Sequence, residues 1–225
     1  MNDEKCKTYK QNNDILLLMN DFELFKNSPT NFTIKLSKPN EALLMSLYNH
    51  IEGLSISSNY DTCSFNSINV QTFDSFVESQ KNLNGTKRLR YEFVETLVSD
   101  ICKQVSYLIE KHRKCFFVIQ TKNIIVIDNG NKFLYVSNNE LLDIKDNSVC
   151  IRRPFTKNQC FLSSELVSLF QLPYTINYNT IYCSIGELAT FCLTGDRTNY
   201  DIEDIHGTKL YFCIRRLVRE RYFFL

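Results

Sequence analysis

The chain has 225 residues, of which 44% are hydrophobic and 23% are charged, with 17 Phe and 12 Tyr. This composition excludes an intrinsically disordered protein and predicts a folded one with a sizeable core. The 26 basic and 25 acidic residues leave a net charge of +1, which excludes a global field that gathers nucleic acid or an anionic membrane surface.

The first eighty residues predict a small antiparallel sheet with one helix. Short apolar runs are separated by turn-forming residues and predict three strands, over 15–18, 22–25 and 32–36. Helical spacing of apolar residues then predicts a helix over 42–54. A Ser- and Asn-rich connection at 55–64 leads to weakly alternating runs at 67–70 and 72–77, which we expect to join the same sheet as strands.

The stretch that follows separates this part from a more helical one. Residues 81–88 are poor in apolar side chains and contain an Asn-Gly pair, so we predict a linker there. The expected domains are therefore 14–80, the linker, and 89–225.

The second part opens with a buried helix and a β-hairpin. Apolar residues recur at three- and four-residue spacing over 93–109 and predict the helix. Apolar runs at 124–127 and 133–136 flank an Asn-Gly turn and predict the hairpin. After an irregular stretch at 138–158, three further helices are expected, over 163–170, 180–193 and 208–221. The fold class is α+β.

The chain carries no apolar run long enough to span a bilayer and no pattern of a secretion signal, so we expect a cytoplasmic protein. Its nine cysteines include no CxxC pair and stand mostly among apolar residues. They predict buried thiols in a reducing compartment. The three histidines have no cysteine or acid at metal-ligand spacing, so no metal site is expected.

This order of elements resembles that of the protein kinase fold, and four local strings resemble kinase motifs. Lys122-Asn123-Ile124 resembles the end of the catalytic loop, where an Asn precedes the hairpin. The other three strings resemble the Ala-Pro-Glu motif, the start of the long buried helix, and the late segment whose Arg pairs with the Glu of Ala-Pro-Glu. They lie at 161–166, 182–188 and 217–221.

The chain therefore resembles the protein kinase-like superfamily, and in particular the short, degenerate kinase-like proteins of large cytoplasmic DNA viruses. The resemblance implies a truncated two-lobed fold, with a small antiparallel-sheet N-lobe carrying one helix and a mainly helical C-lobe. It also implies a structural ion pair between Glu165 and Arg221. A viral origin would place the protein in the host cytoplasm or in the virion.

Phosphoryl transfer needs a glycine loop over the phosphates, a strand lysine, a catalytic Asp, and an Asn and an Asp that hold metal. The resemblance places Lys35 at the strand lysine and Asn123 at the metal-binding Asn, as vestigial nucleotide-site positions. The glutamate that pairs with Lys35 is then Glu41 or Glu52. Gly53 is the first glycine, so no glycine loop precedes Lys35.

The remaining catalytic positions are degenerate. Phe116, Phe117 and Val118 stand where His-Arg-Asp is expected, which removes the catalytic Asp. The metal-binding Asp-Phe-Gly falls on 135–137 or on 137–139, depending on the gap chosen, so its positions include Val136, Ser137 and Asn138. No acid stands at either placement, and Ile181 replaces the Asp of the buried helix. We therefore expect a site without the charges of catalysis, and no catalytic residue, resident metal or cofactor.

These residues also have ordinary structural interpretations. Lys35 can be a strand lysine whose ammonium reaches water, and Asn123 can cap a turn. The leading hypothesis is a pseudokinase that acts by binding a protein partner, and the sequence carries no indication of oligomeric state. One alternative is an atypical, active Ser/Thr kinase that binds ATP and Mg²⁺ and recruits acids such as Asp128, Asp143 or Asp146. Another is an unrelated α+β structural or interaction protein.

Overall fold

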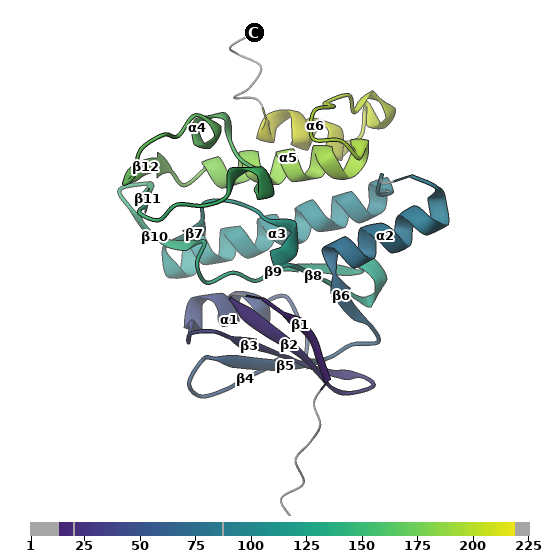
Figure 1. The fold of residues 1–225 in the computed structure, drawn as a ribbon, viewed down its shortest axis with the longest axis vertical. Coiled ribbons are helices and arrows are strands. Elements are labelled where there is room, and N and C mark those ends of the chain that lie inside the picture. Colours follow the sequence, from purple (N-terminus) through teal and green to yellow (C-terminus); the bar gives the residue numbers. More distant parts are fainter. Residues whose placement is uncertain (1–13, 20, 87, 219–225) are drawn as a thin grey trace, which may run out of the picture.

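The computed structural model describes residues 14–19, 21–86 and 88–218, and it shows an α+β fold of antiparallel sheets and helices (Figure 1). The five-stranded sheet and helix α1 form the N-terminal part, and helices α2 to α6 with two smaller sheets form the C-terminal part. One continuous cluster of buried apolar side chains runs through both parts.

The N-terminal sheet has the strand order β1-β2-β3-β5-β4. Its strands are β1 (Asp14–Leu18), β2 (Phe22–Ser28), β3 (Asn31–Leu36), β4 (Ser55–Ile56) and β5 (Thr62–Asn66). Burial alternates along β3, where Phe32, Ile34 and Leu36 are buried, as expected for a sheet with one face on a core. The first three strands are confirmed, whereas β4 and β5 occupy the connection expected at 55–64.

Helix α1 (Glu41–Tyr48) follows β3, ahead of the last two strands of the sheet, and it ends earlier than the expected 42–54. The side chain of Asn40 caps its start by accepting a 3.0 Å hydrogen bond from the amide of Leu43. Leu43, Leu44 and Leu47 are fully buried, so α1 is held by its apolar face.

The expected strand at 72–77 is wrong. Strand β6 (Val70–Thr72) is followed directly by helix α2 (Phe73–Asn84), whose first turn is capped by the hydroxyl of Thr72 at 3.0 Å from the amide of Ser75. Phe73 and Phe76 share one face of the helix at a spacing of three residues, and both rings pack on Phe133 at centroid distances of 6.3 and 5.8 Å. The cap and the aromatic contacts favour a helix here, although the weak alternation of apolar and polar residues had predicted a strand.

The chain crosses between the two parts earlier than expected. Strand β6 pairs with β8 of the C-terminal part, so the boundary drawn at residue 80 lies inside α2. Residues 81–84 of the expected linker form the last turn of this helix, which Gly85 ends in a left-handed conformation (φ 71°).

The predicted hairpin and the long helix before it are confirmed. Helix α3 (Tyr91–His112) leads to β7 (Lys114–Phe116), and the hairpin consists of β8 (Ile124–Ile127) and β9 (Lys132–Tyr135). All of β8 is buried, because the hairpin lies between the N-terminal sheet and α3 (Figure 1). The side chain of Gln104 on α3 makes two hydrogen bonds to the backbone of Tyr135 in β9. It donates a 2.7 Å bond to the carbonyl oxygen and accepts a 3.0 Å bond from the amide.

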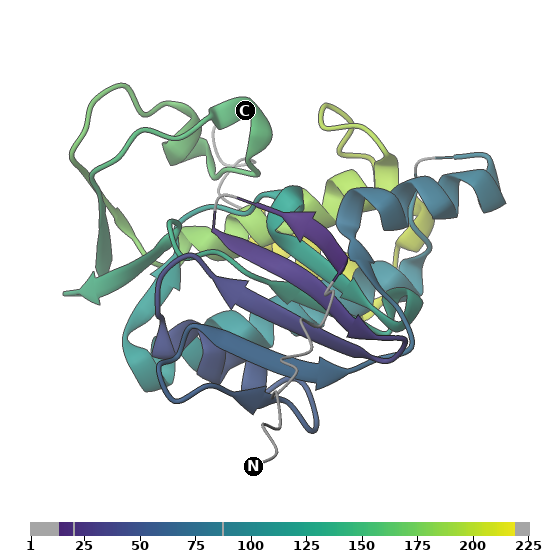
Figure 2. The ribbon, with the colours of Figure 1, turned by 60° about the horizontal axis from the view of Figure 1, so that its bottom comes forward.

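The stretch expected to be irregular contains a second hairpin. Strands β10 (Leu141–Lys145) and β11 (Ser148–Ile151) meet at Asp146 and Asn147, whose φ angles of 46° and 61° suit a tight hairpin turn. With β7 and β12 (Tyr174–Asn177) they form a four-stranded sheet, which extends to one side of the molecule (Figure 2).

The three expected C-terminal helices are present with altered lengths. They are α4 (Ser164–Val167), α5 (Thr180–Thr194) and α6 (Lys209–Leu217). Helix α5 packs against α3 and α6, and its buried Gly186 leaves a space that a methyl group would overfill against Leu217 and Val218. Cys63, Cys115, Cys160 and Cys192 are buried as expected, and the other described cysteines are half-buried.

Candidate functional site

A large cavity of about 800 Å³ lies between the N-terminal and C-terminal parts. Its N-terminal wall comes from the β1–β2 turn, with Asp21, and from the loop before α1, with Lys38 and Asn40. Its C-terminal wall comes from residues 117–123, 138–142 and 150–159. The cavity is therefore bounded by segments that are far apart in sequence.

A buried acid closes the cavity on its N-terminal side. Asp21 is 6% exposed, and its Oδ2 accepts a 2.8 Å hydrogen bond from the hydroxyl of Ser137 and a 3.3 Å bond from the amide of Asn139. Its Oδ1 accepts from the side-chain amide of Asn139. The β1–β2 turn is thus tied to the segment that follows β9.

A second buried acid, Glu140, lies on the other side of Ser137. Its Oε2 accepts a 3.1 Å hydrogen bond from the side chain of Asn123 and a further bond from the hydroxyl of Tyr135. The same hydroxyl accepts a 3.2 Å hydrogen bond from the backbone amide of Gln120. Burial raises the pKa of Glu140 to about 6, with a smaller contribution from the charge of Asp21, while the hydrogen bonds oppose this rise.

The start of α1 is bound to the same segment. The side chain of Asn138 accepts a 2.7 Å hydrogen bond from Asn40 and donates a 2.8 Å bond to the carbonyl oxygen of Lys38. Because Asn40 also caps α1, this contact links the helix terminus to the residues after the hairpin. Neutral amides and hydroxyls therefore join the two parts around the buried acids.

Four cations line the outer part of this cavity. They are Lys38 before α1, Lys122 before β8, and Arg152 and Arg153 after β11. Lys122 is half-exposed and the other three are exposed. None of the four has an ion-pair partner within the described ranges. We call these four residues the cationic rim.

The two vestigial nucleotide-site positions lie apart. Asn123 is 3% exposed and lines the cavity. Lys35 is exposed on β3, on the opposite face from the buried Ile34 and Leu36, and it is not among the residues that line the cavity. Its two proposed partners, Glu41 and Glu52, are exposed, and neither makes an ion pair with it in the described part of the chain.

The degenerate catalytic-loop positions fill the core. Phe116 is 1% exposed, and its ring contacts that of Tyr135 edge-on at a centroid distance of 4.7 Å. Phe117 lines the cavity with its ring 5.3 Å from that of Phe155, and Val118 is fully buried. These side chains contribute packing and offer no proton-transferring group.

Of the three positions predicted as a degenerate metal loop, Val136 belongs to the core, and Ser137 and Asn138 make polar contacts. Val136 and Ser137 are fully buried, and Asn138 is half-buried at the cavity wall. No acid occupies these positions themselves, but two buried acids that were not predicted lie close by: Asp21 accepts a hydrogen bond from Ser137, and Glu140 follows Asn139 in the chain. Glu140 stands one residue beyond the string searched for Asp-Phe-Gly, so a wider window would have found it. Asp21 belongs to a turn that carries no sequence signal for this contact.

The remaining predicted residues lie elsewhere. Glu165 is half-buried and accepts a 3.1 Å hydrogen bond from the hydroxyl of Tyr174. Its expected partner Arg221 lies outside the described residues, so their ion pair stays a prediction. The three acids named for an active kinase also lie outside the large cavity. Asp128 accepts hydrogen bonds from the hydroxyl of Ser67 and from the amides of Ile68 and Asn69. Asp143 forms an ion pair with Lys114, and Asp146 lies in the β10–β11 turn.

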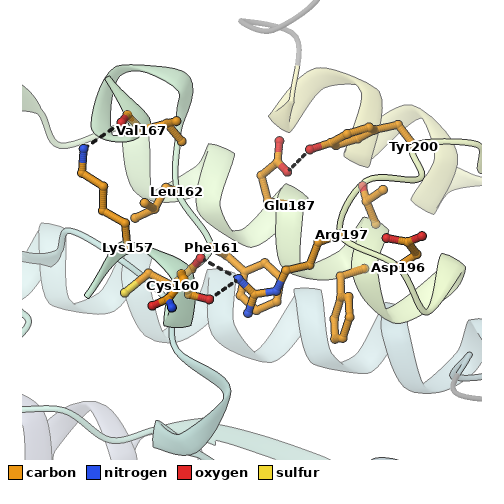
Figure 3. A pocket seen from close by; sticks show the side chains of 12 residues that line it. Lys157, Cys160, Phe161, Leu162, Val167, Glu187, Asp196, Arg197 and Tyr200 are labelled. Carbon is orange, nitrogen blue, oxygen red and sulfur yellow. Dashed lines mark hydrogen bonds between the residues drawn. The ribbon is translucent and has the colours of Figure 1, made fainter. Parts of the chain in front are cut away.

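A smaller cavity of about 250 Å³ lies between residues 157–162, α5 and the loop after it (Figure 3). Arg197 reaches across it and donates hydrogen bonds of 3.0 and 3.1 Å to the carbonyl oxygens of Asn158 and Cys160. Its guanidinium lies 4.3 Å from the ring centre of Phe161 and 5.8 Å from that of Phe191. The cation here holds the segment before α4 against α5.

No protein-family model matches the chain, and no curated protein is similar to it in sequence. Among the residues that the structure describes, no helix is both long and apolar enough to cross a membrane. Across the same residues, no three His, Cys, Asp or Glu side chains gather as they would around a metal ion.

Proposed function

We propose that this chain is a catalytically inactive protein kinase-like protein, a pseudokinase, that acts by binding another protein. The proposal is supported by the small sheet with one helix, the hairpin after a long buried helix, and the cavity beside Asn123 at the hairpin's start. In this interpretation, the N-terminal part corresponds to a reduced N-lobe and the C-terminal part to a truncated C-lobe.

The hydrogen bond between Ser137 and Asp21 is the observation that most supports an inactive protein. One placement of the metal-binding motif puts Ser137 at the position of its Asp, and the β1–β2 turn stands where a kinase has its glycine loop. A buried carboxylate at that turn repels the phosphates of a nucleotide, because like charges interact strongly in a water-poor site. No cation in the described residues pairs with Asp21.

Magnesium does not fit this arrangement. The carboxylates of Asp21 and Glu140 already accept hydrogen bonds from Ser137, Asn139, Asn123 and Tyr135. These hydrogen bonds engage both oxygens of Asp21 and Oε2 of Glu140, whereas a divalent cation needs several oxygens free and directed at one point.

One observation favours the active-kinase alternative. The carboxylate of Glu140 lies beside Asn123, and Asp21 lines the same cavity. Carboxylate and amide oxygens are the ligands that Mg²⁺ uses in kinases. This alternative requires the network around Asp21 and Glu140 to open when ATP binds. The two hypotheses therefore differ in whether nucleotide and metal bind together.

A thermal-shift assay with ATP and either Mg²⁺ or Mn²⁺ tests the proposal, together with an assay for transfer of the γ-phosphate. We expect neither a shift nor transfer. A ligand at roughly 100 times its Kd stabilises a protein by about 2.7 kcal/mol, so binding would be visible. Transfer of the γ-phosphate would overturn the proposal. Comparing Lys35→Met with Lys103→Met, a second exposed lysine, would then show whether that transfer depends on the lysine that the kinase resemblance names.

A further inference from the structure

The cationic rim concentrates charge that the chain as a whole does not have. The net charge of the protein is +1, yet Lys38, Lys122, Arg152 and Arg153 all border one cavity. The cations come from three segments, before α1, before β8 and after β11, so folding brings them together. Unpaired cations around a concave surface attract an anionic ligand and speed its association.

The acids of the same cavity do not neutralise the rim. Asp21 and Glu140 are each 6% exposed and are engaged by neutral hydrogen-bond donors. None of the ion pairs among the described residues joins either acid to a rim cation. The acidic floor of the cavity, Asp21 and Glu140, is therefore engaged by hydrogen bonds within the protein. The cationic rim remains accessible to solvent.

The rest of the lining suits an extended peptide. Neutral amides of Asn139 and Gln159 can exchange hydrogen bonds with a peptide backbone, and Phe117, Pro154 and Phe155 provide apolar contact. A volume of about 800 Å³ exceeds what one small anion fills. A peptide can place its carboxylates at the edge and its neutral backbone over the floor, whereas a nucleotide triphosphate that enters deeply meets Asp21.

We propose that this cavity binds an acidic segment of a protein partner, whose carboxylates pair with Lys38, Lys122, Arg152 and Arg153. The inference rests on the proposed function and names the chemistry of the partner. Arg152 and Arg153 form bidentate pairs with carboxylates, and Lys38 and Lys122 act as point charges on the other sides of the cavity.

Fluorescence anisotropy with the full chain tests this inference. The probe is a labelled, Glu-rich synthetic peptide, and the matched control peptide has Gln in place of every Glu. We expect the Glu peptide to bind at least about tenfold more tightly than the Gln peptide, and its affinity to fall as salt is added. Equal binding of the two peptides, or no binding of the Glu peptide, overturns the inference.

Matched variants locate the binding. Lys122→Glu and the double variant Arg152→Glu/Arg153→Glu should each lower the affinity for the Glu peptide by at least about tenfold, because each reverses charge at the rim. Lys103→Glu, at an exposed position of α3 outside the cavity, should leave binding unchanged. An equal loss in Lys103→Glu would show general charge attraction and overturn the assignment of the site.

ATP and inorganic phosphate serve as competitors. Displacement of the Glu peptide by ATP with Mg²⁺ at a lower concentration than by unlabelled Glu peptide would identify a nucleotide site and overturn the inference. Displacement by phosphate as effective as that by the unlabelled peptide would identify a site for a simple anion and would also overturn it. Phosphate transfer from ATP would contradict the proposed function without changing the peptide result, so the two failures are distinguishable.

Discussion

The hydroxyl of Ser137 donates a 2.8 Å hydrogen bond to the carboxylate of Asp21, which lies 116 residues earlier in the chain. Ser137 is fully buried, and Asp21 is nearly so. The bond joins the β1–β2 turn to the segment that follows the hairpin strand β9. Under the proposed function, this contact occupies the region that a kinase uses to bind phosphate and metal. The large cavity is therefore open toward its cationic rim and closed at its acidic floor.

Asp21→Ala tests this closure. The substitution leaves the Ser137 hydroxyl and the Asn139 amide without their acceptor, so we expect a loss of about 1–3 kcal/mol in the free energy of unfolding. Urea denaturation measures it. Glu95→Gln, at an exposed position of α3, is the matched control and should change stability by less than about 0.5 kcal/mol. Equal stability of the two variants would show that the Asp21 contacts contribute nothing.

The pH dependence of stability tests Glu140. Its pKa is raised to about 6 in the folded protein, so the folded state binds a proton more tightly than the unfolded chain does. The resulting stability is fully present below about pH 4.5 and is lost as the pH rises through about 6. The difference in unfolding free energy between the wild type and Glu140→Gln should therefore fall by about 2 kcal/mol across that window.

Urea denaturation of both proteins at several pH values provides this difference, since Gln at this position does not titrate. Parallel stability curves for the two proteins would contradict the raised pKa. The charge of Asp21 contributes to the raised pKa of Glu140. Asp21→Ala should therefore lower that pKa, so that the loss of stability is complete at a lower pH.

Gly130→Ala tests the packing of the hairpin turn. Gly130 has a φ of 96°, and a methyl group there would lie 2.8 Å from ring atoms of Phe76 and Phe93. Gly85→Ala is the matched control, because Gly85 also has a positive φ (71°) but has open space around it. We expect Gly130→Ala to lose about 1–3 kcal/mol more than the control in thermal or urea denaturation, owing to overpacking. Similar losses would mean that backbone strain alone limits both positions.

Arg197→Lys tests the bridge across the smaller cavity (Figure 3). A lysine keeps the charge but loses the planar group that lies over Phe161 while donating to the carbonyl oxygens of Asn158 and Cys160. We expect a loss of about 0.5–1 kcal/mol in unfolding free energy. Arg216→Lys, at an exposed position of α6, should show no loss. Equal values for the two variants would assign the bridge no role in stability.

Local patterns were sufficient for the elements whose signal lies within a few residues. The hairpin of β8 and β9 was predictable because two apolar runs flank an Asn-Gly turn, and α5 was predictable to within one residue at its end. The weak alternation over 72–77 misled the assignment, since Thr72 caps a helix there. The β10–β11 hairpin was not predicted, because its turn pair Asp146-Asn147 lacks the glycine that marks such a turn in the sequence, although both residues adopt a positive φ.

By itself, the sequence determined the α+β class, the hairpin and the buried helices. Only the tertiary structure decided that Asp21 and Glu140 meet beside Ser137, that Lys35 faces solvent, and that four distant cations border one cavity. The physical reason is that periodicity encodes which face of an element is buried. It does not encode which polar side chains meet, because that depends on how elements more than a hundred residues apart pack together.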